Sequence, residues 1–246
     1  MIIGLAAAKF INNNVNYNLN NCMKYIKNAK EKNVDLLLFG ETYLQGFESL
    51  EWIPEKDLLI GLDKQSNELN ILRKYCKENE IALGIGYIER QNNTLFSSYL
   101  IIDKNGNDLT NYRRMSRGWR ENNTDEKVYL EGNNFYIFKY MGFNLCLGLC
   151  GDFWEESVIE KLPKNNADIV FWPVFISYDK KTWEKEELNI YIEQAKKIHK
   201  NILLVNSICD EEKSSAYGGA FAINDNKLIA SLEQEKEDIL IIKYEF

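Results

Sequence analysis

A cysteine at the end of an apolar segment is the first residue of this sequence whose position suggests chemistry. In F-N-L-C-L-G-L-C-G-D-F-W-E-E (143–156), large apolar residues alternate with small ones up to Cys150. This pattern predicts a strand covered on both faces, followed by a tight turn and a short helix over 153–162. A side chain at such a corner is lifted off the sheet, next to backbone N–H groups that can stabilise a developing negative charge.

The corner would also favour a reactive thiol, because the positive end of a helix lowers a thiol pKa. A structural alternative stands beside this interpretation. Free cysteines are among the most buried residue types, and the strand by itself favours a buried thiol at Cys150. Cys146, in the middle of the strand, is expected to be a core residue.

Two charged segments fall at comparable places. Glu41 follows the predicted buried strand V-D-L-L-L-F-G (34–40), and Arg113 and Arg114 open a basic loop. Ligand sites of open α/β sheets gather at the carboxyl ends of strands. A carboxylate beside a thiol can accept its proton, and a fixed cation stabilises thiolate and oxyanion. Together these residues have the parts of an acyl-transfer site.

Histidine, the usual partner of a catalytic cysteine, offers only one candidate. His199 is the single histidine of the chain, near the end of a predicted helix over 183–200. There it complements the helix dipole, so we expect a surface or last-turn residue and no Cys-His dyad.

The composition excludes several classes of protein. The 246 residues carry a net charge of -7, and the pI near 5.1 argues against a nucleic-acid partner. We see no run long enough for a membrane span, and the apolar start of the chain lacks a basic n-region. The five cysteines form no C-x-x-C pair, which argues against disulfides and zinc. We therefore expect a cytoplasmic protein with reduced thiols and with no metal or other cofactor.

Predicted strands and helices alternate along the whole chain. This alternation indicates one α/β domain over 1–246 with two sheets between helical layers. Helices are expected over 19–32 and 63–79 in addition to 183–200, and residues 48–62 are expected to be irregular. The other strands are expected over 2–9, 81–88, 95–102, 135–138, 167–173, 202–208 and 239–244, and a hairpin is expected to turn at 224–226.

Five segments in this order resemble the nitrilase, or carbon–nitrogen hydrolase, family. They are L-L-L-F-G-E-T-Y-L-Q-G-F, L-G-L-C-G-D-F-W-E, A-D-I-V-F-W-P, I-E-Q-A-K-K-I-H-K-N-I-L-L-V-N and Y-G-G-A-F-A-I-N-D. The resemblance covers nearly the whole chain and implies the four-layer α-β-β-α sandwich of that family. It also implies packing into homodimers or larger homo-oligomers.

The resemblance implies a role for each candidate. Cys150 would attack the carbon of a small non-peptide amide, and Glu41 would act as general base and then acid. The N–H of Gly151 would bind the oxyanion, and water would hydrolyse the thioacyl intermediate. Glu126 would be the family's second glutamate, with Glu121 and Glu131 as competitors and a solvated loop carboxylate as the structural alternative.

One position departs from the family pattern. Tyr112-Arg113-Arg114 matches a Y-R-K segment, so Arg114 stands where the family has its catalytic lysine. Arginine keeps the charge and several donors, but its planar head changes the geometry. Two interpretations follow: an active amidase, or a catalytically silent homologue that binds a metabolite or a partner. Acyl transfer to another amine uses the same residues, and nitrile hydrolysis is the less favoured chemistry.

Substrate contacts are the least determined part of the prediction. Trp172, just past a strand end, and Tyr112 are expected at the substrate pocket, although aromatic residues at such spacing are more often core. Arg113, Arg117 and Arg120 give the loop a cationic character. An anionic substrate is a hypothesis from that cluster, with solvated loop charges as the default.

Overall fold

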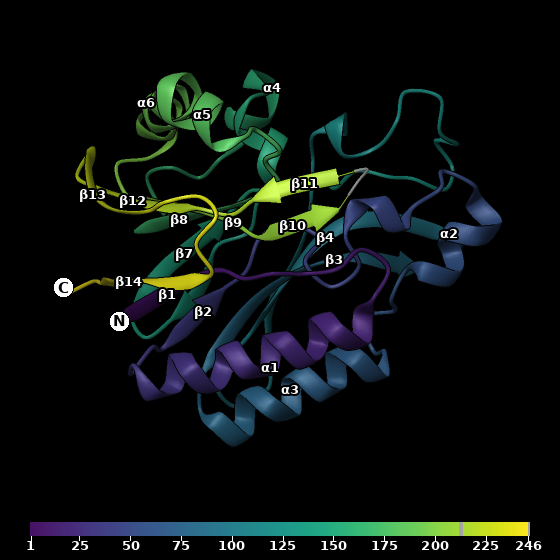
Figure 1. Cartoon of the computed structure of the whole chain (residues 1–246), viewed down its shortest axis with the longest axis horizontal. Coiled ribbons are helices and arrows are strands. Elements are labelled where there is room, and N and C mark those ends of the chain that lie inside the picture. The colour runs from purple at the N-terminus through teal and green to yellow at the C-terminus, as the bar shows by residue number, and fades with distance from the viewer. Residues whose placement is uncertain (212–213, 246) are drawn as a thin grey trace.

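Two six-stranded sheets packed face to face form the centre of the molecule, which is represented by a computed structural model that describes residues 1–211 and 214–245. The strand order is β14-β1-β2-β3-β4-β5 in the first sheet and β13-β12-β9-β8-β7-β6 in the second, and β10 pairs separately with β11. Helices α1 and α3 cover one outer face and α4 to α6 the other (Figure 1). This arrangement confirms the predicted α-β-β-α sandwich.

The elements have the following bounds. The first sheet contains β14 (Asp238–Lys243), β1 (Ile2–Ala7), β2 (Leu36–Leu38), β3 (Ala82–Gln91), β4 (Thr94–Ile102) and β5 (Asp108–Arg113). The second contains β13 (Lys227–Leu232), β12 (Ala220–Asn224), β9 (Ile202–Asn206), β8 (Ile169–Val174), β7 (Phe143–Leu147) and β6 (Phe138–Tyr140). The separate pair is β10 (Ile208–Glu211) and β11 (Ser214–Tyr217). The α-helices are α1 (Val15–Glu31), α2 (Pro54–Ile60), α3 (Asn67–Asn79), α4 (Glu156–Ile159), α5 (Lys180–Thr182) and α6 (Leu188–Ile198). Short 3-10 turns are η1 (Phe47–Ser49), η2 (Arg117–Trp119) and η3 (Cys150–Phe153), and a π-helical turn, η4 (Trp183–Glu187), joins α5 to α6.

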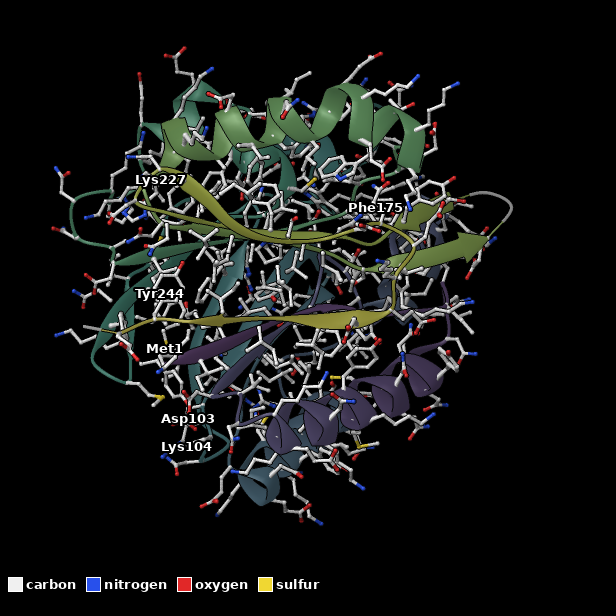
Figure 2. All side chains as sticks on the ribbon, turned by 60° about the vertical axis from the view of Figure 1, so that its left-hand side comes forward. Met1, Asp103, Lys104, Phe175, Lys227 and Tyr244 are labelled. Carbon is white, nitrogen blue, oxygen red and sulfur yellow. The ribbon has the colours of Figure 1, made fainter. Side chains whose placement is uncertain are left out.

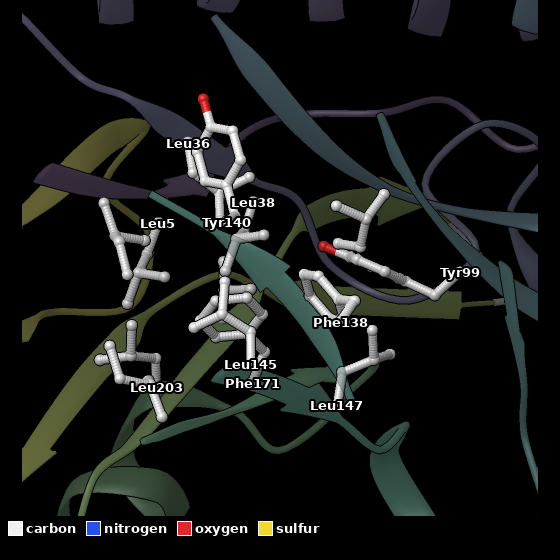
Figure 3. Packing of buried hydrophobic residues seen from close by; sticks show 14 of the residues in the cluster. Leu5, Leu36, Leu38, Tyr99, Phe138, Tyr140, Leu145, Leu147, Phe171 and Leu203 are labelled. Carbon is white, nitrogen blue, oxygen red and sulfur yellow. The ribbon is translucent and has the colours of Figure 1, made fainter. Parts of the chain in front are cut away.

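Alternation along the strands sorts the side chains into three apolar layers. In β7, Leu145 and Leu147 face the first sheet and pack with Leu38 and Tyr99 (Figure 3). Cys146, on the other face, joins the cluster beneath α6. A third layer lies between the first sheet and helices α1 and α3. The strand predicted to be covered on both faces is therefore confirmed.

Both sheets have three parallel strands at their centre, and these strands end at the same side of the sandwich. β1, β2 and β3 are parallel in one sheet, and β7, β8 and β9 in the other. Beyond the end of β2, the Glu41 N–H donates to the Val174 carbonyl at the end of β8 (3.2 Å). Gly40 N–H likewise donates to the Ser207 hydroxyl beyond β9 (3.0 Å). These hydrogen bonds connect the two sheets at the edge where Glu41 and Cys150 follow their strands.

The chain ends lie at the opposite side. β14 returns to pair with β1, and the Met1 amino group donates to the Tyr244 carbonyl (2.8 Å). Met1 and Tyr244 lie at one end of the molecule and Phe175, which follows β8, at the other (Figure 2). The carboxyl ends of the parallel strands are therefore remote from the chain termini.

Several predicted elements need correction. The helix expected over 153–162 is only the four-residue α4 after a 3-10 turn, and the segment 48–62, expected to be irregular, contains α2, which begins at a proline. The partner strand of β7 is β6 (Phe138–Tyr140), a few residues after the predicted 135–138. Helices α1 and α3 were correctly predicted as helices. Their starts differ from the prediction by four residues because side-chain caps at Asn14 and Ser66 set them.

In the described part of the chain, no helix combines the length and apolarity needed to cross a bilayer.

A close backbone approach at Gly86 generates a prediction about stability. A methyl group added there would collide with the Thr42 amide nitrogen and the Gly40 carbonyl oxygen. Since backbone cannot move aside like a flexible side chain, we expect Gly86→Ala to lower the free energy of unfolding by about 1–3 kcal/mol. Urea denaturation measures this. Leu59→Ala, at a side chain that is 81% exposed, is the control, with a change below about 0.5 kcal/mol; equal effects of the two variants would contradict the prediction.

Candidate active site

The thiol of Cys150 lies where the second sheet ends. Cys150 begins η3 and adopts φ +37°, a left-handed conformation that non-glycine residues rarely take. Its S–H donates to the Phe175 carbonyl (3.7 Å), and its own carbonyl accepts from the Trp172 indole N–H (2.9 Å). These hydrogen bonds hold the turn in a strained conformation at the carboxyl edge of the sheet. Strained backbone of this kind often occurs at functional sites.

Glu41 and Arg114 form a buried ion pair beside this thiol. Nη1 of Arg114 donates to both carboxylate oxygens of Glu41 (3.1 and 3.3 Å). The Ser97 hydroxyl donates to Oε1 of the carboxylate (2.8 Å), and the Ser116 hydroxyl accepts from Nε of the guanidinium (2.8 Å). Both charged side chains are at least 95% buried. Each charge therefore has a charged partner and a hydroxyl, as buried charges require.

The second terminal nitrogen of Arg114 faces the cysteine turn. A methyl group added at Gly151 would collide with Nη2 of Arg114. Gly151 follows Cys150 directly and lies in the first turn of η3, where N–H groups have no intrahelical acceptor. The guanidinium thus reaches from Glu41 to the peptide that follows the thiol.

The site raises the thiol pKa. Burial and, to a smaller extent, the charge of Glu41 raise the pKa of Cys150 while Arg114 lowers it, and together they bring it to about 11. Burial also raises the pKa of Glu41, against which Arg114 and Ser97 act. The expected lowering of the thiol pKa by a helix is therefore wrong, because η3 is a single short turn and desolvation outweighs it.

Tyr112, predicted to contact substrate, is instead buried and hydrogen-bonded within the protein. Its hydroxyl donates to Asp152 (2.7 Å), and its side chain is 1% exposed. Trp172 is completely buried, and its indole N–H is engaged by Cys150. Both aromatic residues thus support the turn that carries the thiol.

Glu126 is not brought to the Cys150, Glu41 and Arg114 group. Its carboxylate is 66% exposed and pairs with Arg117 (2.9 Å). Glu131, one of its competitors, pairs with Arg120 (2.6 Å). This arrangement supports the alternative of a solvated loop carboxylate for Glu126.

The loop cations are likewise paired. Arg113 binds Glu89 with two N–H donors (2.9 and 2.6 Å), and Arg117 and Arg120 pair with the glutamates just described. The hypothesis of an anionic substrate therefore loses the free cations on which it rested.

His199 directly follows α6, and its Nδ1 lies 2.7 Å from the Asn201 carbonyl oxygen. Both residues directly precede β9, so His199 lies at the opposite end of the sheet from Cys150. In the described residues, no group of three or more His, Cys, Asp or Glu side chains could hold a metal ion.

Sequence reasoning missed the supporting hydroxyl of Ser97. The signal was present in L-F-S-S-Y-L, where two serines interrupt an otherwise apolar strand. Buried polar groups are nearly always hydrogen-bonded, so Ser97 and Ser98 each implied a polar partner. They donate to Glu41 (2.8 Å) and Glu89 (2.7 Å) respectively.

Two known proteins are similar to this chain in sequence over most of its length. The chain is 24% identical over 245 residues to deaminated glutathione amidase of Dictyostelium discoideum, which covers 94% of this chain and 83% of that protein. It is 18% identical over 233 residues to glutamine-dependent NAD(+) synthetase of Acinetobacter baylyi, and this match covers 94% of the chain but only 42% of the synthetase.

A solved structure shares the fold. The carbon–nitrogen hydrolase of Helicobacter pylori superimposes with a TM-score of 0.83 at 16% identity, covering 98% of this chain and 87% of that one. The family model described as carbon-nitrogen hydrolase matches residues 3–245. Because this match spans residues 3–245 of the 246, the chain belongs to the carbon–nitrogen hydrolase family.

Proposed function

We propose that this protein hydrolyses the non-peptide C–N bond of a small amide through a thioacyl intermediate on Cys150. The observation that carries the proposal is the buried Glu41–Arg114 ion pair beside the thiol, where the two sheets meet. Family membership supports hydrolysis of a C–N bond. The ion pair supports the further step, because it offers a base and a fixed cation to the same sulfur.

In the first half of the reaction, the Glu41 carboxylate accepts the thiol proton and the sulfur of Cys150 attacks the amide carbon. The C=O bond opens to an oxyanion, which the Gly151 N–H and Nη2 of Arg114 stabilise. Glu41 then returns the proton to the amide nitrogen, the C–N bond breaks, and ammonia or an amine leaves. A thioester remains on the sulfur.

In the second half, water attacks the thioester with Glu41 again accepting a proton. The C–S bond breaks, the proton returns to the sulfur, and a carboxylic acid leaves. A raised thiol pKa suits this sequence, because the sulfur stays protonated at neutral pH and the carboxylate beside it is the proton acceptor. Glu41 thus transfers one proton in each half: the thiol proton leaves with the amine, and a proton from water restores the thiol.

Loss of Glu41 tests the general-base role. In a panel of small primary amides assayed by ammonia release, we expect Glu41→Gln to lower turnover by about 10² to 10⁴-fold. Glu89→Gln is the matched control, since Glu89 also pairs with an arginine and a serine but belongs to a separate group of residues. Comparable losses in the two variants would argue for a structural effect and against general-base catalysis.

The charge of Glu41 also predicts the pH dependence of alkylation. The rate at which iodoacetamide labels wild-type Cys150 should rise with pH, with the midpoint of the rise near pH 11. Glu41→Gln removes a negative charge that raises this pKa and leaves Arg114, which lowers it. Labelling of Cys150 at pH 8 should therefore become about tenfold faster for each unit by which the pKa falls. Peptide mass spectrometry measures the labelling rate, with buried Cys22 as the internal reference. Slower labelling of the variant would contradict the effect of the Glu41 charge on the thiol pKa.

Arg114→Lys separates an active amidase from a silent homologue. A lysine has a single nitrogen head, whereas Arg114 uses three nitrogens toward Ser116, Glu41 and Gly151. We expect the variant to lose about tenfold or more in turnover. A wild-type protein without turnover on the panel, together with a gain of turnover in Arg114→Lys, would instead show that arginine had silenced the site.

A further inference from the structure

We propose that Asp152 is a positioning residue that fixes the turn carrying Cys150 against the segment carrying Arg114. The inference rests on the proposed function, because it names what holds that site in register. Asp152 lies two residues after the thiol and is completely buried. Its carboxylate lies where the end of the first sheet meets the end of the second.

Four donors converge on this one carboxylate. Oδ1 accepts from the Met115 N–H (2.9 Å) and the Ser116 N–H (2.7 Å). Oδ2 accepts from the Leu149 N–H (2.8 Å) and the Tyr112 hydroxyl (2.7 Å). Hydrogen bonds to a charged acceptor are about twice as strong as neutral ones, and a carboxylate offers about four lone-pair sites. The acceptor is therefore saturated.

The origin of the donors gives the arrangement its meaning. Leu149 and Asp152 flank Cys150 on the second sheet, whereas Met115 and Ser116 directly follow Arg114 beyond the last strand of the first. The same Ser116 accepts from Nε of the guanidinium (2.8 Å). One side chain thus connects the backbone on both sides of the thiol to the backbone after the cation. Because catalysis is sensitive to displacements of about 1 Å, loosening this connection would misalign Arg114 with the turn.

The charge of Asp152 does not help the thiol ionise. It raises the pKa of Cys150, although Arg114 has the larger influence in the opposite direction. The two possible roles therefore predict opposite signs. If Asp152 acted through its charge alone, its neutralisation would speed up thiol alkylation. If Asp152 positions Arg114, its neutralisation releases the Arg114 segment. The lowering of the thiol pKa by Arg114 is then lost, and alkylation slows.

Asp152→Asn tests this, because asparagine keeps the shape but cannot accept from the Leu149 N–H through its amide nitrogen. We expect iodoacetamide labelling of Cys150 at pH 9 to slow at least threefold, and kcat on the best amide of the panel to fall about 100-fold with KM within threefold. Asp168→Asn is the matched control: Asp168 also accepts a backbone N–H, from Asn144 (2.7 Å), at the opposite end of the sheet. It should leave both readouts at the wild-type value.

Tyr112→Phe provides a second variant should Asp152→Asn fold poorly. It keeps the carboxylate and removes one of the four donors, so we expect the same direction with a smaller loss in kcat, about tenfold. Faster or unchanged labelling in Asp152→Asn, or wild-type kinetics in Tyr112→Phe, would overturn the positioning role. A wild-type protein without amide turnover would count against the proposed function only, since the labelling arm still decides the role of Asp152.

Discussion

The buried ion pair between Glu41 and Arg114 is the constraint on which the rest of the site depends. Removing two charges from water costs several kcal/mol for each ion, and their attraction offsets this cost only with good geometry and further hydrogen bonds. Ser97 and Ser116 supply those bonds. Both charges come from the first sheet, and the second sheet covers them. The pair therefore requires the assembled sandwich, and the assembled sandwich places the thiol beside it.

A neighbouring pair shows what burial changes. Glu89 and Arg113 are also supported by a serine, Ser98, and alternation along β4 and β5 places them on the other face of the same sheet. There the arginine side chain is 26% exposed, and its hydrogen bonds help hold the pKa of Glu89 below its ordinary value. Glu41, with the same kinds of partner, has a raised pKa because desolvation dominates. Chemically similar pairs thus differ in basicity through their surroundings.

Much of the fold could be predicted from the sequence, because the signals are local. Alternating apolar residues determined the central strand, and helical spacing determined α1 and α3. The site was predictable only in part. Strand ends pointed to Glu41 and Cys150, and the match to a Y-R-K segment pointed to Arg114, which the structure places against Glu41. The partners of the other side chains depend on tertiary contacts that no local pattern specifies. Glu126 was therefore predicted as the second glutamate of the site and Tyr112 as a substrate contact, whereas their neighbours in space are Arg117 and Asp152.

Arginine at position 114 changes how the site is built. A lysine ammonium is a compact charge on a flexible stem, whereas a guanidinium presents donors in a fixed plane. In this protein one edge of that plane binds Ser116, one nitrogen binds Glu41, and the remaining nitrogen faces Gly151. A rigid head with three assigned directions tolerates little movement of its backbone. The geometry of Arg114 therefore depends on the hydrogen bonds that Asp152 accepts from the N–H groups of Met115 and Ser116, the two residues that follow the arginine.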